Sequence, residues 1–296
     1  MNKESNKYIF LYSIALVVLV AAVLAVASIA LKPYQQKNRE VEKQQSILRS
    51  VQKAADVKSA PNKAQYIAEE YGKYITSSFI VNSQGEKVDG DAFAVDLEEE
   101  MAKPLFDRKL PVFVCTDSDS TKKYILPVRG TGLWGPLWGY VSFTDDYNTI
   151  FGVVFDHKGE TPGLGAEIAT PKFQSQFAGK QIFDGATFTS VHVVKGGGTQ
   201  GKLHEVDAIS GGTITSKGLE EMLKSTLSGY LKFVEEAKWQ RARAVEAAPQ
   251  PVVRPRRPAP TPVVVDTPAH HHHHAEAQEE EAVVEEFLVE EKADSI

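Results

Sequence analysis

The segment with the greatest chemical promise is residues 207–216, which read Asp-Ala-Ile-Ser-Gly-Gly-Thr-Ile-Thr-Ser. Two glycines, Gly211 and Gly212, precede Thr213, so its hydroxyl is sterically open to a modifying enzyme. Apolar residues at helical spacing follow over residues 219–234, which predicts that the segment leads into a helix. A phosphate on Thr213 would then face the positive end of a helix dipole.

Local architecture accounts for the same residues without any chemistry. The two glycines can simply turn the chain, and Thr215 or Ser216 can cap the helix by accepting hydrogen bonds from its free N–H groups. Helix caps are far commoner than reactive sites, so residue types alone favour the cap. Both interpretations stay open at this point.

Other kinds of site are poorly supported. Residues 196–198 are three glycines without the spacing of a dinucleotide-binding loop, and no phosphate-binding P-loop sequence occurs. A Ser/His/Asp catalytic triad built on His192 or His204 is not supported, because no nucleophile-elbow serine sequence occurs. Residues 145–146 are two aspartates between predicted strands, which is typical of a solvated turn. Cys115 is the single cysteine, which excludes an internal disulfide and a cysteine-ligated metal cluster.

A membrane anchor is predicted near the amino terminus. Residues 1–7 form a short tail, and residues 8–31 contain no charge, where a bilayer needs about 20 apolar residues. This run exceeds the ~7–15 residues of a signal-peptide core, which favours an uncleaved anchor. Residues 32–56 continue as an amphipathic helical stalk. Basic residues are commoner after the anchor than before it, which alone would place the large domain in the cytoplasm.

The body of the chain, residues 57–243, is predicted to be one α+β domain with a mostly antiparallel sheet, because strands follow strands. Without its tail it is nearly neutral, with no basic stripe to bind nucleic acid. The expected strands are residues 77–81, 111–115, 123–128, 138–144, 148–156 and 187–195, and the expected helices are residues 92–103, with Val95, Leu97 and Met101 inward, 171–178 and 219–234.

Residues 244–296 form a tail rich in Pro, His and Glu, which we expect to be disordered because such a composition cannot pack a core. It carries 11 acidic and 4 basic residues, so the acidity of the chain lies there. Its five histidines, residues 270–274, could bind a transition metal, but an incidental tract is at least as good an explanation and we predict no metal site.

Residues 207–216 resemble a flavinylation motif, in which an Asp is followed by Ser/Thr-Gly-Ala-Thr and FMN is joined to the last threonine. Residues 139–156, followed by Glu-Thr-Pro-Gly-Leu-Gly at residues 160–165, resemble a second signature of the same FMN-binding domain. With the anchor and the stalk, about residues 1–240 are similar to the family of C-type subunits of sodium-translocating NADH:quinone reductases. The usual alanine of the motif is Gly212 here.

The resemblance implies a covalent FMN, attached by a flavin transferase through a phosphoester to Thr213, in a domain of about residues 130–235. Thr215 is the fallback acceptor, Pro162-Gly163 can equally be a plain turn, and Trp134 can equally be a core residue. The other implied FMN-binding residues are Ser210, Gly211, Gly212, Thr215, Thr161, Leu164, Gly165 and Trp134.

The resemblance also implies an electron carrier without catalytic residues of its own, within a sodium-pumping translocase. Electrons from NADH would pass through this FMN toward the flavin of the B-type component and quinone, beside partner subunits A, B, D, E and F. The anchor would sit in the inner membrane with the domain on the periplasmic side. The alternatives are the G-type component of the related Rnf electron transport complex, disfavoured by the stalk and the insert before Gly139, and a cofactor-free anchored interaction module.

Overall fold

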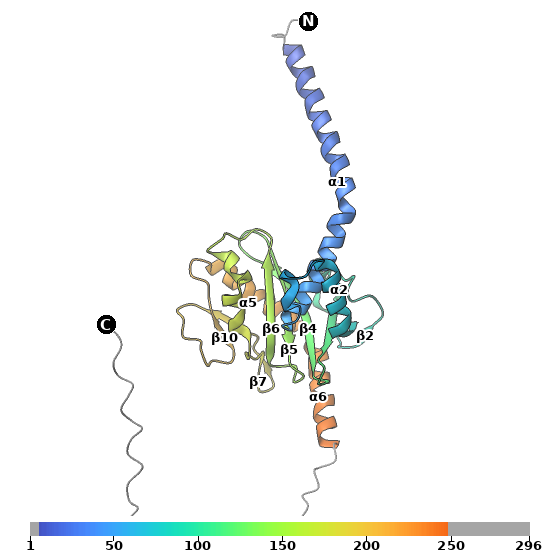
Figure 1. Ribbon diagram of the computed structural model, residues 1–296. Helices are drawn as coiled ribbons and strands as arrows, with labels where there is room; N and C mark the ends of the chain where they lie inside the picture. The colour runs from blue at the N-terminus through green and yellow to red at the C-terminus, as the bar shows by residue number, and fades with distance from the viewer. Residues whose placement is uncertain (1–5, 248–296) are drawn as a thin grey trace, which may run out of the picture. The chain divides into compact units, whose positions relative to one another are not determined.

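The computed structural model describes residues 6–247, and the predicted tail with its histidines lies almost entirely outside them. The apolar segment and the first part of the predicted stalk form one continuous helix, α1 (Asn6–Ser50), with Pro33 inside it. The stalk predicted to reach residue 56 therefore ends as a helix at Ser50, where the chain turns. Its apolar stretch is long enough to cross a bilayer, and none of that stretch is buried against the rest of the protein. Figure 1 shows α1 extending away from the domain that its last turns touch.

Six strands of the described residues form an antiparallel sheet in the order β2-β1-β3-β4-β5-β6. The strands lie side by side nearly in chain order, which confirms the predicted α+β class with a mostly antiparallel sheet. Their bounds are Ile75–Val81 (β1), Lys87–Val88 (β2), Leu110–Thr116 (β3), Lys122–Thr131 (β4), Pro136–Phe143 (β5) and Ile150–His157 (β6).

Both faces of the sheet are covered. The end of α1 and α2 (Lys63–Tyr74) pack on one face, where Ile47 contacts Phe113 and its neighbours. On the other face, α5 (Thr213–Ser228) and α6 (Leu231–Ala247) complete a larger core. Because both faces are buried, β3 is a continuous run of buried residues instead of an alternating one.

Short elements complete the described part of the chain. Two small ribbons flank the main sheet, β7 with β8 and β9 with β10. Their bounds, and those of the short helices, are Phe183–Asp184 (β7), Thr187–Phe188 (β8), His192–Val194 (β9), Glu205–Asp207 (β10), Ala55–Lys58 (η1), Leu97–Ala102 (α3), Leu105–Asp107 (η2), Gly165–Ala169 (η3), Pro171–Gln174 (α4) and Ser175–Phe177 (η4).

Four expected elements differ from the structure. The helix predicted at 171–178 is α4 followed by the 3-10 helix η4. The helix predicted at 92–103 begins only at Leu97, because the Asp96 side chain caps it by accepting from the backbone N of Glu98, and within it only Glu100 is buried. The strand predicted at 187–195 is two strands, β8 and β9, separated at Ser190, whose positive φ of 62° breaks an extended chain. They pair with different partners, β9 running parallel to β10.

The apolar stripe at residues 219–234 likewise belongs to two helices, not one. α5 ends at Ser228 and α6 begins at Leu231, and between them the fully buried Tyr230 donates its hydroxyl to the carbonyl of Pro111 over 3.0 Å. Apolar residues recur at helical spacing through both helices, because both pack on the same face of the sheet.

α1 runs along the sheet in a definite direction. Just beyond its end, Lys53 Nζ lies 2.9 Å from Asp117 Oδ1 in the β3–β4 connection. Ten positions earlier, Lys43 donates to the carbonyl of Phe93 in the loop that follows β2. Because the chain just beyond the end of α1 lies at the β3–β4 connection, the apolar part of α1 leaves the domain at the opposite end of the sheet, which carries the β1–β2 turn (Figure 1).

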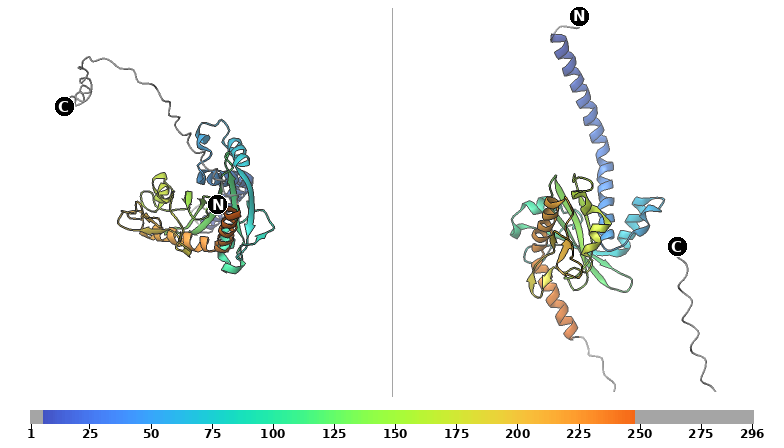
Figure 2. Two further views of the ribbon diagram at one scale, coloured as in Figure 1. Left: turned by 90° about the horizontal axis from the view of Figure 1, so that it is seen from below. Right: turned by 90° about the vertical axis from the view of Figure 1, so that its left-hand side faces the viewer.

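The β4–β5 connection lies at this same end. Val81, the last residue of β1, pairs with Lys87, the first residue of β2, and with Leu110, the first residue of β3. Because neighbouring strands are antiparallel, the end of β4, the start of β5 and the end of β6 meet there too. In Figures 1 and 2, α1 (blue) and α6 (orange) accordingly leave opposite ends of the domain.

Candidate functional site

A pocket of about 380 Å³ opens where the β4–β5 connection, the segment after β6 and the start of α5 meet. Its volume is within the usual ~300–1,000 Å³ of small-molecule sites. Of the nine FMN-binding residues expected from the sequence, eight line it: Trp134, Thr161, Leu164, Gly165, Gly211, Gly212, Thr213 and Thr215. The ninth, Ser210, lies exposed just before them and is not among the lining residues.

Thr213 stands at the start of α5. It is the first residue of that helix, it is partly exposed, and the preceding Gly212 is an N-cap residue that offers no side-chain cap. No acidic residue lies in the first turn. The N–H groups and the positive end of the α5 dipole are therefore available to an anion held at Thr213.

The predicted helix cap is wrong. Thr215 lies inside the helix and is 1% exposed, and its hydroxyl donates to Glu160 Oε2 over 2.6 Å. Ser216 is also helical, and its Oγ accepts from the backbone N of Ile209 over 3.2 Å. Neither side chain caps α5, and the fallback acceptor Thr215 is buried with its hydroxyl proton already donated.

Glu160 is the one ionisable residue among the described residues lining the pocket, and it was not predicted as a site residue from the sequence. Its side chain is 4% exposed, and Oε1 accepts from the backbone N of Trp134 over 2.8 Å while Oε2 accepts from Thr215. Gly132 and Gly165 make room for it, since a Cβ at either would lie 2.5 Å or 2.3 Å from its carboxylate oxygens. Glu160 is the first residue of the Glu-Thr-Pro-Gly-Leu-Gly signature, and this position could have identified it as a site residue.

Apolar side chains stand exposed around the mouth of the pocket. Trp134 is 66% exposed, so the expectation that it is a core residue is wrong. Leu133, Leu164 and Ile214 are 49%, 42% and 57% exposed. Leu133 and Ile214 also line the pocket without having been predicted, because isolated apolar residues carry no signal in a sequence.

The two glycines before Thr213 are required by close packing. Gly211 has a φ of 75°, and a Cβ there would lie 2.6 Å from Leu164 Cδ2. At Gly212 a Cβ would lie 2.9 Å from Ile209 Cγ2. Glycine at position 212, in place of the usual alanine, therefore leaves room for the Ile209 side chain.

The aspartate that opens the motif has a structural task. Asp207 Oδ1 accepts from the Thr199 hydroxyl over 2.8 Å and from its backbone N over 3.3 Å. The backbone N of Asp207 donates to Gln176 Oε1 over 2.9 Å. Asp207 thereby closes the glycine-rich loop before Thr199 and fixes the strand that leads into the site.

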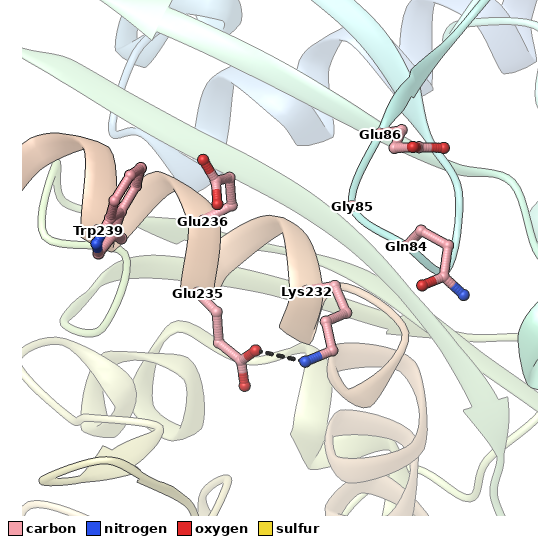
Figure 3. Close-up of a pocket in the computed structure, with 7 residues that line it drawn as sticks. All are labelled: Gln84, Gly85, Glu86, Lys232, Glu235, Glu236 and Trp239. Atoms are coloured by element: carbon pink, nitrogen blue, oxygen red, sulfur yellow. Dashed lines mark hydrogen bonds and ion pairs between the residues drawn. The ribbon is translucent and has the colours of Figure 1, made fainter.

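A second, larger cavity of about 690 Å³ lies elsewhere, between the β1–β2 turn and α6 (Figure 3). Its lining includes the Lys232–Glu235 ion pair (2.9 Å) and Trp239, and it contains none of the predicted site residues. Within residues 6–247, no group of three His, Cys, Asp or Glu side chains could hold a metal. Residues 270–274 lie outside the described residues.

The pocket at the start of α5 suits a ligand with two chemical parts. An uncapped helix start with an open hydroxyl suits a phosphate, and the exposed tryptophan and aliphatic side chains suit a flat aromatic ring. FMN has both parts, so the residues present fit this cofactor.

Comparisons with known proteins agree with this fit. The model of the FMN-binding domain family matches residues 132–228, which contain the whole pocket. The C subunit of the Na(+)-translocating NADH-quinone reductase (NqrC) of Vibrio anguillarum is 32% identical over 235 residues, covering 74% of this chain and 89% of its own. NqrC of Haemophilus ducreyi is 32% identical over 239 residues, covering 75% and 90%.

Solved structures show the same relationship. The crystal structure of NqrC from Parabacteroides distasonis superposes with a TM-score of 0.61 at 46% identity, covering 69% of this chain and 96% of that chain. The Shewanella oneidensis NqrC structure gives a TM-score of 0.58 at 28% identity, covering 68% and 99%.

Proposed function

Because this chain belongs to the NqrC family of Na(+)-translocating NADH-quinone reductase components, we propose that it holds FMN covalently through a phosphoester to Thr213. The FMN-binding domain match supports an FMN-carrying subunit of that oxidoreductase complex. The observation that carries the covalent bond is the position of Thr213, at the uncapped start of α5 inside a pocket built from both sequence signatures. The NqrC relatives favour this assignment over the G-type component of the Rnf complex.

The attachment requires an activated donor and an enzyme. An alcohol and a free phosphate do not condense spontaneously in water, so the donor is a flavin nucleotide whose phosphate is joined to a second phosphate. The Thr213 Oγ–phosphorus bond forms as that anhydride bond breaks, the second phosphate leaves with the bridging oxygen, and the hydroxyl proton passes to solvent or to the transferase. A dedicated flavin transferase supplies this step, and Thr213 supplies the acceptor oxygen.

FMN, when bound, accepts and passes on electrons, which this chain cannot do with side chains alone. The chain's own residues bind and orient it. The free N–H groups of α5 neutralise the phosphate, and Trp134 and Leu164 shelter the ring from water. Held by these residues, the FMN would supply an electron carrier between NADH and the flavin of the B-type component and quinone, in a complex with subunits A, B, D, E and F.

The direction of α1 supports electron exchange near the membrane. The pocket lies at the end of the sheet from which the apolar part of α1 departs, as the contacts of Lys43 and Lys53 show. With α1 in the inner membrane and the domain on its periplasmic side, the FMN faces the bilayer and the membrane subunits.

In-gel flavin fluorescence after denaturing electrophoresis tests the proposal. The full chain and its Thr213→Val and Thr213→Ser variants are produced together with a flavin transferase. We expect a fluorescent band for the unaltered chain, none for Thr213→Val, and retained fluorescence for Thr213→Ser, which keeps a hydroxyl. A dark band for the unaltered chain, or a fluorescent one for Thr213→Val, contradicts the proposal.

A further inference from the structure

The charge inside the pocket is unusual. Of the eleven residues that line it, all in the described part of the chain, Glu160 alone has an ionisable side chain. It is 4% exposed, so water solvates it poorly, and a group placed in the pocket is close to it.

The hydrogen-bond partners of Glu160 are neutral. Oε1 accepts from the Trp134 backbone N–H and Oε2 accepts from the Thr215 hydroxyl, an arrangement that an ionised carboxylate satisfies without donating. None of the ion pairs between residues 6–247 includes Glu160. The backbone N of Glu160 donates to Nδ1 of the nearby His157 over 3.2 Å, so that ring nitrogen is an acceptor toward Glu160.

We propose that Glu160 is a positioning residue whose negative charge lowers the reduction potential of the flavin in this pocket. Reduction adds electrons to the flavin, supplied by the upstream carrier, while protons follow from solvent. A fixed negative charge in a poorly solvated site opposes the added electrons, because the repulsion is weakly screened there. This inference rests on the proposed function, since it requires FMN in the pocket.

The same carboxylate also fixes the geometry on which that charge acts. Through its two oxygens it joins the β4–β5 connection at Trp134 to the first turn of α5 at Thr215. If Glu160 had only a structural role, removing its charge and removing its hydrogen-bond donor would have the same effect on the flavin. If its charge matters, the two changes have different effects, because Thr215→Val removes a donor and leaves the carboxylate in place.

A potentiometric titration of the full flavinylated chain in detergent makes this separation. Flavin absorbance is followed with redox mediators while dithionite reduces and ferricyanide reoxidises the bound FMN. We expect a more positive midpoint potential for Glu160→Gln, and an unchanged or more negative one for Thr215→Val. Asp156→Asn, which removes an exposed carboxylate of β6, is the matched control and leaves the potential unchanged because water screens that charge.

Equal potentials for Glu160→Gln and the unaltered chain overturn the inference, as does the same positive shift in Glu160→Gln and Thr215→Val. If Glu160→Gln does not retain flavin, Glu160→Asp is titrated instead. Glu160→Asp keeps the charge, so we expect the midpoint potential of its flavin to be closer to that of the unaltered chain than to that of free FMN in the same buffer. A midpoint potential closer to that of free FMN overturns the inference. In-gel fluorescence of the same samples tests the proposed function separately. If covalent flavin is present but Glu160→Gln and the unaltered chain have equal midpoint potentials, only the proposed role of Glu160 is contradicted.

Discussion

The hydroxyl of Thr215 donates to Oε2 of Glu160 over 2.6 Å, across 55 positions of sequence. This bond joins the two signatures that the sequence presents separately, the Glu-Thr-Pro-Gly-Leu-Gly segment after β6 and the start of α5. The two segments therefore form one site whose geometry depends on a buried carboxylate.

Replacing Thr215 with valine tests the structural value of this bond. Thr215→Val leaves a buried carboxylate oxygen without its hydroxyl donor, and we expect the free energy of unfolding to fall by about 1–3 kcal/mol. We expect the proposed flavin attachment at Thr213 to be retained. Urea denaturation of the full chain in detergent measures the loss, with Thr187→Val, at an exposed position of β8, as a control within about 0.5 kcal/mol of the unaltered chain. Equal stability of the two variants would contradict the prediction.

Gly165 is a site where a single methyl group should disturb both partners. The added Cβ of Gly165→Ala would lie 2.3 Å from Glu160 Oε2 and 2.5 Å from Thr215 Oγ1, so one of them must move. We expect a loss of about 1–3 kcal/mol in stability and weaker flavin loading by in-gel fluorescence. Gly159→Ala is the control, because its nearest neighbour is 3.9 Å away. Full loading of Gly165→Ala would show that the pocket tolerates the displacement.

Local pattern predicted much of this molecule. The apolar run and five of the six strands of the main sheet follow from spacing, since each depends on near neighbours in sequence, whereas β2 was not predicted. The eight pocket residues follow from the resemblance of two motifs to the FMN-binding family. Glu160 escaped prediction because its partners lie at distant positions, and Thr215 was misassigned as a cap for the same reason. The division of residues 187–195 into two strands depends on the backbone at Ser190, which no residue pattern announces.

A charged cluster fastens the chain beyond α1 to the sheet. Asp117 lies between Lys123 and Lys53, with the Lys53 pair at 2.9 Å. Burial alone would raise the pKa of Asp117, but hydrogen bonds from Lys123 and Lys53 outweigh it, and the pKa lies below its ordinary value. The hydrogen bond to Asp117 likewise raises the pKa of Lys53.

Asp117→Asn should therefore change how stability depends on pH. A carboxyl with a lowered pKa in the folded state stabilises above its unfolded pKa of about 4, and this contribution is lost as the pH falls through the folded value. We expect the variant to be less stable than the unaltered chain at pH 7, with the difference shrinking below about pH 4. Thermal unfolding across this range measures it.

The exposed Asp184 provides the comparison for that measurement. Asp184→Asn removes the same charge from β7, where water screens it, so its melting curve should follow that of the unaltered chain at every pH. A constant gap between Asp117→Asn and the unaltered chain from pH 7 down to pH 3 would show that the loss comes from packing and not from the ion pairs.

The last turn of α1 is docked against β5 and β6, at one edge of the sheet. The Ser142 hydroxyl donates to the carbonyl of Ser50 over 2.6 Å, and Ser50 is fully buried. Gly152 on the neighbouring strand leaves the space for that carbonyl, since a Cβ there would lie 2.5 Å from it. α1 is thus seated on the face of the sheet opposite α5, and this contact sets how the domain is held relative to its anchor.

Gly152→Ala should weaken the packing of the last turn of α1 on the sheet without affecting the pocket. Its methyl group must displace the Ser50 carbonyl, which is backbone and cannot rotate away, so we expect faster amide hydrogen exchange over residues 47–53 in the full chain. Flavin loading of Thr213 should stay unchanged, because Thr213 lies on the opposite face. Gly72→Ala in α2, where nothing lies within 4 Å of the added Cβ, should leave exchange in residues 47–53 unaltered. Unchanged exchange in Gly152→Ala would mean that the sheet yields instead of α1, and α1 would then keep its seat.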